Sequence, residues 1–266
     1  MKISILLPYK ENFSPIYAGA VSLFVKDTTI LSKYKKYITI YGNTNLKKIF
    51  NLKYKNIFLK KSLIQSGSKA YVSQFLKYEN ENPSDIIEIH NRPNYFHLIN
   101  NSKINQKLVL YFHNDPLTMT GSRSTADRKK ILANATKIIF NSHWSRKRFL
   151  EGIGGFDINS EKMTVIYQST KPTNVNIYKK KNWITFVGKL NRAKGYDLFG
   201  RAVLKILKKY KNWKAIVIGD EPRLTLNFKH IRLNNLGFQN HSKVLKVFER
   251  TSIAVACSRW DEPLGR

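Results

Sequence analysis

Two short polar stretches each follow an apolar segment in the second half of the chain. One is Gly188-Lys-Leu-Asn-Arg-Ala-Lys-Gly195, and the other is Glu262-Pro-Leu-Gly265. The first brings two lysines and Arg192 to the predicted start of a helix, where unpaired backbone N–H groups favour a phosphate. Its spacing matches neither a dinucleotide fingerprint nor a Walker loop. A basic surface turn capped by glycine is the alternative interpretation.

The second stretch adds a carboxylate at the predicted carboxyl edge of the same sheet. An apolar strand over 253–257 leads to Glu262, and open parallel sheets bind ligands along that edge. A carboxylate can bind sugar hydroxyls while Lys189 and Lys194 neutralise a diphosphate. Together the two stretches therefore indicate a site for a nucleotide-activated sugar.

Two histidines lie at the carboxyl ends of other predicted strands. His113 comes after the strand over 108–112, and His90 ends the strand over 86–90. A histidine in such a place can face a polar ligand or pack within a loop, and both interpretations stay open. Asp115 precedes a proline, and we expect a solvated turn residue there rather than a catalytic base.

The sequence gives little support for a metal or a bound cofactor. It contains no Asp-x-Asp motif and no cluster of histidines, cysteines and carboxylates at ligand spacing. Cys257 is the only cysteine, which excludes an internal disulfide. We therefore expect no metal and no cofactor, with the nucleotide sugar acting as a substrate.

Short β-branched runs alternate with helical patterns, as in parallel sheets with crossover helices. Strands are predicted over 3–7, 38–41, 57–59, 86–90, 108–112, 137–140, 164–167, 184–187, 215–218, 231–233 and 253–257. Helices are predicted over 19–33, 71–78, 142–152, 196–210 and 242–250. The prediction is an α/β protein of two doubly wound, Rossmann-like domains. The first covers residues 1–171, and the second covers residues 172–266 and is incomplete. The boundary is expected in a polar, proline-containing stretch.

The composition indicates a folded and strongly basic protein. Of 266 residues 42% are hydrophobic, and 47 Lys+Arg against 17 Asp+Glu give a net charge of +30. The lysine runs are scattered, which suits anionic substrates or an anionic membrane surface better than nucleic acid, although a chain-wide lysine bias explains them equally well. No segment approaches the roughly 20 apolar residues of a membrane span, and the N-terminal apolar run is too short for a signal peptide. We expect a cytoplasmic protein, either soluble or peripheral at the inner membrane face.

The two polar stretches resemble the donor-binding motifs of glycosyltransferase family 4, whose members are retaining enzymes of GT-B fold. In that family a Gly-Arg-Leu-x-x-x-Lys-Gly segment supplies two cations to the donor diphosphate, and Lys189 and Lys194 fill those positions. Lys189 replaces the usual arginine, which keeps the positive charge but loses the bidentate hydrogen bonding to phosphate. Glu262-Pro-Leu-Gly265 matches the opening of the second motif, whose further glutamate would fall four residues beyond Arg266. The resemblance therefore implies a truncated C-terminal part.

The resemblance extends into the first half of the chain. Gly19 and Ala20 stand where the family has a small-residue loop near the transferred sugar and the acceptor. His113 stands where members often carry a histidine that faces the sugar, whereas Gln168-Ser169 departs from the usual Asn-Gly turn. The family's fold implies an acceptor-side N-terminal domain and a nucleotide-sugar-binding C-terminal domain that face a cleft.

The resulting hypothesis is a retaining glycosyltransferase of the hexosyltransferase type, acting on a cell-surface glycan or a lipid-linked acceptor. The expected catalytic residues are Lys194, Glu262, Lys189 and His113, and the expected substrate-binding residues are Gly19, Ala20, Gly188, Asn191, Arg192, Pro263, Leu264 and Gly265. The runner-up is a non-catalytic anion- or nucleic-acid-binding module of the same fold. Another GT-B enzyme, such as a nucleotide-sugar epimerase, fits the Lys194 and Glu262 contexts less well.

Overall fold

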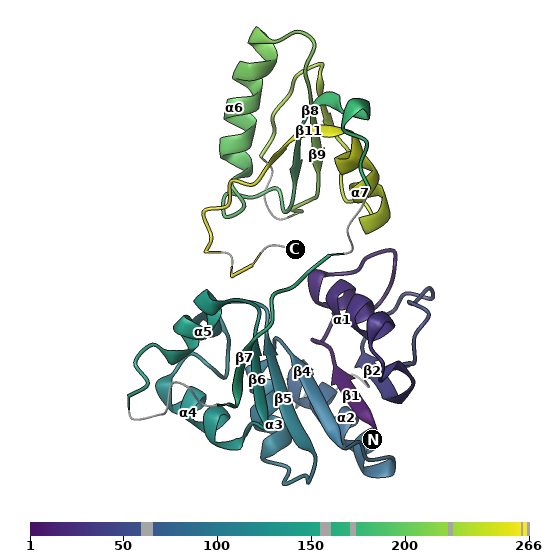
Figure 1. Ribbon diagram of the computed structural model, residues 1–266, viewed down its shortest axis with the longest axis vertical. Coiled ribbons are helices and arrows are strands. Elements are labelled where there is room, and N and C mark those ends of the chain that lie inside the picture. Colours follow the sequence, from purple (N-terminus) through teal and green to yellow (C-terminus); the bar gives the residue numbers. More distant parts are fainter. Residues whose placement is uncertain (60–65, 155–160, 171–173, 223–225, 262, 265–266) are drawn as a thin grey trace. The chain divides into compact units, whose positions relative to one another are not determined.

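A computed structural model describes residues 1–59, 66–154, 161–170, 174–222, 226–261 and 263–264. Its contacts divide the chain into two compact units (Figure 1). The first comprises Met1–Thr170 with Pro263–Arg266, and the second comprises Lys171–Glu262. Among the described residues, no helix is long and apolar enough to span a membrane.

The first unit is built on a seven-stranded parallel sheet. Its strands are β1 (Ile3–Leu6), β2 (Ile38–Gly42), β3 (Tyr54–Asn56), β4 (Ile86–His90), β5 (Lys107–Phe112), β6 (Lys137–Phe140) and β7 (Met163–Val165). They lie in the order β3-β2-β1-β4-β5-β6-β7, so the direction of the winding reverses between β1 and β4. Figure 1 shows β4 to β7 side by side.

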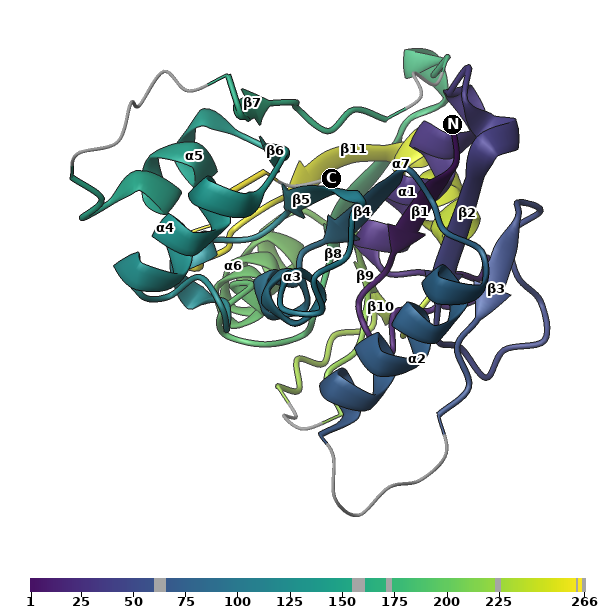
Figure 2. The ribbon, with the colours of Figure 1, turned by 90° about the horizontal axis from the view of Figure 1, so that it is seen from below.

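Helices cover both faces of this sheet. Its helices are α1 (Ala20–Leu31), α2 (Gly67–Glu81), α3 (Pro93–Asn100), α4 (Thr125–Asn134) and α5 (His143–Leu150). Neighbouring residues of β1 point to opposite faces, so Ile5 packs in one core with Phe24 of α1, and Leu6 packs in the other with Phe75 of α2. The side chains of α3, α4 and α5 join the second core, and Figure 2 shows α2 to α5 in an arc along one side of the strands.

Several local predictions for this unit are confirmed. β4 and β6 have the predicted bounds, and α5 begins at His143, within the helix predicted over 142–152. Ser142 is its N-cap, with the hydroxyl accepting a hydrogen bond from Ser145 N at 3.1 Å. The short helices Lys35–Tyr37 and Pro116–Thr118 complete the connections.

Other local predictions for this unit are wrong. The strand expected over 57–59 is Tyr54–Asn56, because the pairing with β2 ends at Asn56 and Ile57 is buried just beyond it. The sequence patterns missed α3, which has a proline in its first turn, and α4, which buries only Arg128, Ile131 and Leu132.

The second unit is a four-stranded parallel sheet with the order β10-β9-β8-β11. Its strands are β8 (Lys181–Val187), β9 (Lys214–Ile218), β10 (Leu233–Asn235) and β11 (Thr251–Val255), and the short helix Ile177–Lys179 precedes them. Its helices α6 (Tyr196–Lys209) and α7 (His241–Arg250) lie on opposite sides of the strands in Figure 1. The core lies beneath α6, where Val203 and Leu207 pack with Phe186 and Val217.

The predicted strand over 231–233 begins two residues too early. Ile231 is 94% exposed, and pairing with β9 starts where Leu233 faces Ala215. Ile231 is therefore an apolar residue just before the strand, and its side chain has no partner in the sheet.

Candidate functional site

The order of the strands fixes where each sheet can bind a ligand. In the second unit, β9 and β11 lie on opposite sides of β8, so the direction of the winding reverses between β8 and β11. In the first unit the same reversal occurs between β1 and β4. Crevices for ligands form at such reversals in open α/β sheets.

Asn191 holds the loop that follows β8 in a compact turn. Its side-chain oxygen accepts a hydrogen bond from Lys194 N at 3.0 Å, and its carbonyl oxygen accepts one from Tyr196 N at 3.1 Å. Its side-chain nitrogen donates to Glu221 Oε2 at 3.2 Å. Asn191, predicted to bind substrate, thus shapes the loop 188–195 from within.

Gly195 allows this loop to approach the segment that follows β11. Its φ is +72°, and a Cβ added there would lie 1.9 Å from the carbonyl oxygen of Cys257. The Cys257 thiol contacts the carbonyl oxygen of Gly195 at 3.2 Å, and Arg259 N donates to the carbonyl oxygen of Ala193 at 2.8 Å. The two polar segments at the switch point of this sheet are therefore in direct contact as far as Trp260.

An ion pair fixes this contact at the start of α6. Arg259 donates two hydrogen bonds to Asp197, Nη1 to Oδ1 at 2.6 Å and Nη2 to Oδ2 at 2.9 Å. Arg201 adds a third at 3.2 Å. The hydrogen bonds from Arg259 lower the pKa of Asp197 to about 2. Asp197 therefore stays ionised in the first turn of α6, where a negative charge is favourable.

Three cations lie in the loop that leads to the same helix start. Lys189 and Arg192 are exposed, whereas Lys194 is half-buried in the turn. The positive end of the helix and these side chains together produce a local potential that favours an anion. Gly188, at the end of β8, places the backbone of the loop close to them.

The remaining residues of the predicted donor site are not all described. Glu262 and Gly265 lie outside the described residues. Pro263 is buried and Leu264 is half-buried, and both are grouped with the first unit. Within the second unit, the structure brings Gly188, Lys189, Asn191, Arg192 and Lys194 together.

His113 is fixed at the carboxyl edge of the first sheet. Its backbone N and that of Asn114 both donate to Asn91 Oδ1 at 3.2 Å, and its carbonyl oxygen accepts from Asn141 Nδ2 at 2.8 Å. Asn91 adopts a φ of +55°, which asparagine tolerates better than most residues. Neither asparagine was among the predicted site residues, although each directly follows a predicted strand.

The ring of His113 lies in a chain of polar side chains. Its Nε2 is 2.8 Å from His90 Nδ1, and His90 Nε2 is 2.6 Å from Glu88 Oε1. Gln168 Nε2 contacts His113 Nδ1. Glu88 and Gln168 were not predicted as site residues. Alternation along β4 could have identified Glu88, because it shares a face with His90.

A carboxylate fills the space beside Gly19 and Ala20. Glu11 Oε1 accepts a hydrogen bond from Ser22 N at 3.1 Å, and a Cβ at Gly19 would lie 2.2 Å from that oxygen. Burial raises the pKa of Glu11. The small residues at the start of α1 thus accommodate a half-buried acid that was not among the predicted site residues.

Asp115 corrects one expectation. It is buried rather than solvated, because its carboxylate accepts hydrogen bonds from Leu117 N at 3.0 Å and from Arg148 Nη2 at 2.9 Å. The pairing with Arg148 of α5 makes it a structural residue that connects two elements.

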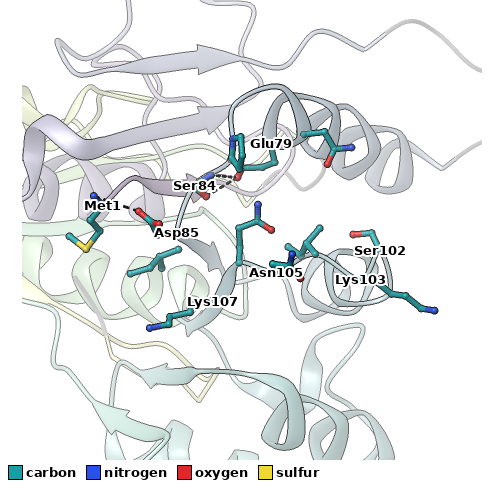
Figure 3. Close-up of a pocket in the computed structure, with 13 residues that line it drawn as sticks. Met1, Glu79, Ser84, Asp85, Ser102, Lys103, Asn105 and Lys107 are labelled. Atoms are coloured by element: carbon teal, nitrogen blue, oxygen red, sulfur yellow. Dashed lines mark hydrogen bonds and ion pairs between the residues drawn. The ribbon is translucent and has the colours of Figure 1, made fainter.

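A hollow of about 1060 Å³ lies at the opposite, amino edge of the first sheet (Figure 3). Its buried carboxylate, Glu79, is satisfied by Ser84 and by the hydroxyl of Ser4 at 2.5 Å. Within the described ranges, no group of three or more histidines, cysteines or carboxylates is placed to hold a metal ion. The loop 188–195, with its three cations, belongs to the second unit and lies far along the chain from this hollow.

Comparisons with known proteins agree with this geometry. Residues 168–266 match the family model of glycosyl transferases group 1. No curated protein matches the chain in sequence.

Solved structures share the whole architecture. A complex of Anabaena HepE with UDP-glucose has a TM-score of 0.71 and 17% identity, over 100% of this chain and 76% of that chain. The lipopolysaccharide outer core galactosyltransferase WaaB in its apo form has a TM-score of 0.60 and 14% identity, over 97% and 74%. WaaG, a glycosyltransferase involved in lipopolysaccharide biosynthesis, has a TM-score of 0.58 and 12% identity, over 97% and 75%. The chain therefore has the α/β fold of GT-B glycosyltransferases, and from residue 168 onward it matches the group 1 glycosyl transferase family.

Proposed function

We propose that this protein is a glycosyltransferase that moves a sugar from a nucleotide-sugar donor to an acceptor. The observation that carries the proposal is the loop 188–195, which gathers three cations at the start of α6. That loop lies within the residues that match group 1 glycosyl transferases. Structures of HepE with UDP and with UDP-glucose support a donor of this class.

In this proposal the loop binds the donor diphosphate. Lys189, Arg192 and Lys194 supply the positive charge, and the backbone at Gly188 approaches the phosphates. Helix N-termini and lysines both favour such a group without a metal ion, so we propose that none is required. Glu262, Pro263, Leu264 and Gly265 would contact the sugar.

The reaction that we propose retains the configuration of the sugar, as in family 4. The bond between the anomeric carbon and the leaving phosphate oxygen breaks while the acceptor oxygen bonds to the same face of that carbon. The acceptor proton passes to the departing phosphate. Charge develops on the diphosphate in the transition state, so Lys194 and Lys189 would accelerate the reaction electrostatically.

The proposed acceptor is a cell-surface glycan or a lipid-linked precursor, and the transferred group is a hexose. Two of the solved structures with this fold are described as proteins of lipopolysaccharide biosynthesis or its outer core. The groups at the carboxyl edge of the first sheet, among them Gly19, Ala20 and His113, would contribute to the acceptor side. The scattered lysines would attract the protein to the cytoplasmic surface of an anionic membrane.

Hydrolysis in the absence of an acceptor tests this function directly. Purified protein incubated with UDP-glucose, UDP-galactose or GDP-mannose should slowly release the nucleoside diphosphate, and added free UDP or GDP should inhibit the release. Lack of both release and inhibition for every donor would contradict the proposal.

A non-catalytic module that binds nucleic acid is the second candidate, and the net charge of +30 favours it. Affinity for a nucleic acid falls steeply with salt because binding releases counterions. A titration of RNA binding against sodium chloride, repeated with free UDP as competitor, separates the two. Tight RNA binding that UDP does not displace would favour the module.

A further inference from the structure

Lysines gather at the amino edge of the first sheet. All of its strand pairs are parallel, so the residues that begin the strands lie along one edge. Six of the seven strands described in this sheet have a lysine at their first residue or at most two residues before it: Lys2, Lys36, Lys53, Lys107, Lys137 and Lys162. Lysines that are scattered along the chain are therefore brought together by the fold.

Three of these lysines surround one cavity. The cavity has a volume of about 200 Å³ and is lined by Lys2, Lys36 and Lys53. Lys2 Nζ donates to Asn82 Oδ1 at 2.5 Å, and because an ammonium group has three N–H bonds, the same nitrogen can also donate to an anion. The described residues that line the cavity contribute hydroxyl and amide groups as well, and no carboxylate. The cavity therefore offers three cations and neutral donors to a phosphate group.

Among the strands described in this sheet, β4 starts without a lysine, and this does not reverse the charge of the edge. Asp85 precedes β4, and its Oδ2 lies 3.6 Å from the N-terminal ammonium of Met1 (Figure 3). The same oxygen accepts a hydrogen bond from Lys2 N at 2.6 Å. Glu79 is buried and accepts from the hydroxyl group of Ser84 at 2.7 Å. Both carboxylates are therefore bound within the protein, and the lysines give the edge its charge.

Exposed apolar side chains lie at the same edge. α1 follows β1 and leads to β2, so its last turn lies at the amino ends of these parallel strands. Ile30 is 48% exposed and Leu31 is 85% exposed, although the opposite face of α1 is buried in the core. Tyr34 and Tyr37 are exposed in the same connection. The segment 30–37 therefore presents apolar surface that a partner could remove from water.

A lysine lies over each of the two exposed tyrosines. Lys33 Nζ is 5.1 Å from the ring centroid of Tyr34, and Lys36 Nζ is 5.0 Å from that of Tyr37. Tyrosine and lysine both have an apolar body and a polar tip, which suits the boundary between lipid head groups and acyl chains. Lys36 and Tyr37 also line the cavity. The segment 30–37 and the cavity are therefore continuous, and we call them together the amino-edge surface.

We infer that the amino-edge surface docks on an anionic lipid bilayer, with a lipid phosphate in the cavity and with Ile30 and Leu31 among the acyl chains. The lysines require an anionic partner. A nucleic acid would use the lysines and the tyrosines, whereas the exposed aliphatic side chains gain only from an apolar interior such as that of a bilayer. The inference gives the membrane contact a definite surface, and it rests on the proposed function only for the lipid-linked acceptor that brings the enzyme to a membrane.

Vesicle flotation with the full chain tests the electrostatic part of the docking. The protein should bind vesicles that contain phosphatidylglycerol and should not bind vesicles of phosphatidylcholine alone. Lys36→Gln should lower the partition coefficient about fivefold, the usual contribution of one lysine near an anionic leaflet. Lys69 is exposed in the first turn of α2, at the opposite edge of the sheet, and is the matched control. Lys69→Gln should leave the coefficient within about twofold, because its charge is screened at that distance.

The apolar part of the docking is tested at Leu31, with Phe58 as the control. Phe58 is also exposed, but it follows the carboxyl end of β3, and replacement of either side chain leaves the core intact. Leu31→Ser should lower the partition coefficient about tenfold or more, whereas Phe58→Ser should not change it. In Leu31→Trp the added tryptophan should be quenched by lipids with brominated acyl chains, and in Phe58→Trp it should not.

Three results would overturn the inference. Equal losses for Lys36→Gln and Lys69→Gln would mean that the net charge of the protein, and not this surface, attracts the vesicles. Unchanged binding in Leu31→Ser together with no quenching in Leu31→Trp would mean that the segment 30–37 does not enter the bilayer. Binding of single-stranded RNA that Lys36→Gln weakens, without binding to either kind of vesicle, would assign the lysines to nucleic acid.

Nucleotide binding by the same variants separates this inference from the proposed function. Lys36→Gln and Leu31→Ser should leave calorimetric binding of UDP and GDP unchanged, because both residues belong to the first unit and the loop 188–195 belongs to the second. If a nucleotide binds and the vesicles do not, the docking surface falls while the proposed donor site stands. If the vesicles bind with the expected losses and no nucleotide binds, the docking surface stands and the proposed function falls.

Discussion

Glu11 is a half-buried acid at the point where the winding of the first sheet reverses. Its carboxylate lies against Gly19 and accepts from the backbone of Ser22. Burial is the main reason that its pKa is raised above 4.5, and Ser22 only partly offsets it. A raised pKa means that folding favours the protonated acid, so this contribution to stability is present below the unfolded pKa and is lost as the pH rises.

Replacing Glu11 with glutamine should remove this pH dependence. Glutamine is neutral and keeps an oxygen that can accept from Ser22 N. The free energy of unfolding of Glu11→Gln should exceed that of the wild type by a margin that grows as the pH rises from about 4.5 towards neutrality. Denaturant titrations across this range measure the margin, with Glu81→Gln on exposed surface as the control. A margin that shrinks as the pH rises would contradict burial as the cause.

Lys194 and His113 should differ in their effects on turnover. Lys194 would stabilise the charge that develops on the leaving diphosphate, whereas both ring nitrogens of His113 contact other side chains of the first unit. Lys194→Ala should therefore lower kcat more than His113→Ala does, by a factor of at least ten, which corresponds to about 1.4 kcal/mol. Rates of donor hydrolysis for both variants measure this. A larger loss of kcat in His113→Ala than in Lys194→Ala would contradict the role of Lys194 in stabilising the leaving diphosphate.

The junction of the β8 loop with the segment after β11 depends on a glycine. Gly195 combines a φ of +72° with a close approach to Cys257, whereas Gly237 has a φ of +63° and open space where a Cβ would be. The pair therefore separates the cost of the backbone conformation from the cost of the contact.

Gly195→Ala should destabilise the second unit more than Gly237→Ala. Alanine in the left-handed region costs roughly 1–2 kcal/mol at both positions. At Gly195 the added methyl must also displace the Cys257 carbonyl group, which adds to that loss. Chemical unfolding of the two variants measures the difference. Equal losses would mean that the junction is looser than the structure shows.

The ion pair between Asp197 and Arg259 should govern the acid titration of this junction. Because Arg259 lowers the pKa of Asp197 to about 2, the stabilisation is present above the unfolded pKa of 3.8 and is lost as the pH falls through about 2. Arg259→Gln should raise the pKa of Asp197 towards 3.8, and Arg201→Gln should raise it less, because Arg201 contributes less to the shift. Carboxyl NMR titrations measure both shifts. A larger effect of Arg201→Gln would contradict the geometry.

The sequence predicted best those elements whose pattern is local. Both strands β4 and β6 are short apolar runs between polar residues, and their bounds were predicted correctly. The helix α4 was not predicted, because few of its side chains are buried. The strand β3 was predicted at the wrong residues, because its buried neighbour Ile57 lies outside the pairing with β2. Bounds depend on pairing and burial, and neither is visible in a single sequence.

The candidate site was predictable only where its residues are close in the chain. The loop 188–195 is one continuous stretch, so its cations could be recognised from their spacing. By contrast, His90, His113 and Gln168 are 23 and 55 positions apart along the chain, and the order of the strands brings them together. Glu11 was missed for the same reason, because its burial depends on α1.

At the scale of the whole molecule, each unit has its own sheet, with two hydrophobic cores in the first unit and a separate one in the second. Units with separate cores can unfold separately. Calorimetry should therefore show two thermal transitions. UDP or GDP should raise the midpoint temperature of only the transition that belongs to residues 171–262, because a ligand stabilises the unit that it binds. Gly195→Ala identifies that transition by lowering it. A nucleotide that raises only the other transition would place the anion site in the first unit.

The central claim is that the loop 188–195 binds the diphosphate of a nucleotide sugar, and calorimetric binding of UDP, GDP and ADP tests it most directly. Lys208 on the far turn of α6 is exposed and provides a matched control. We predict saturable binding of at least one nucleotide, weakened about tenfold or more by Lys194→Ala and unchanged by Lys208→Ala. Equal weakening by the two variants, or no binding of any of the three nucleotides, would contradict the account.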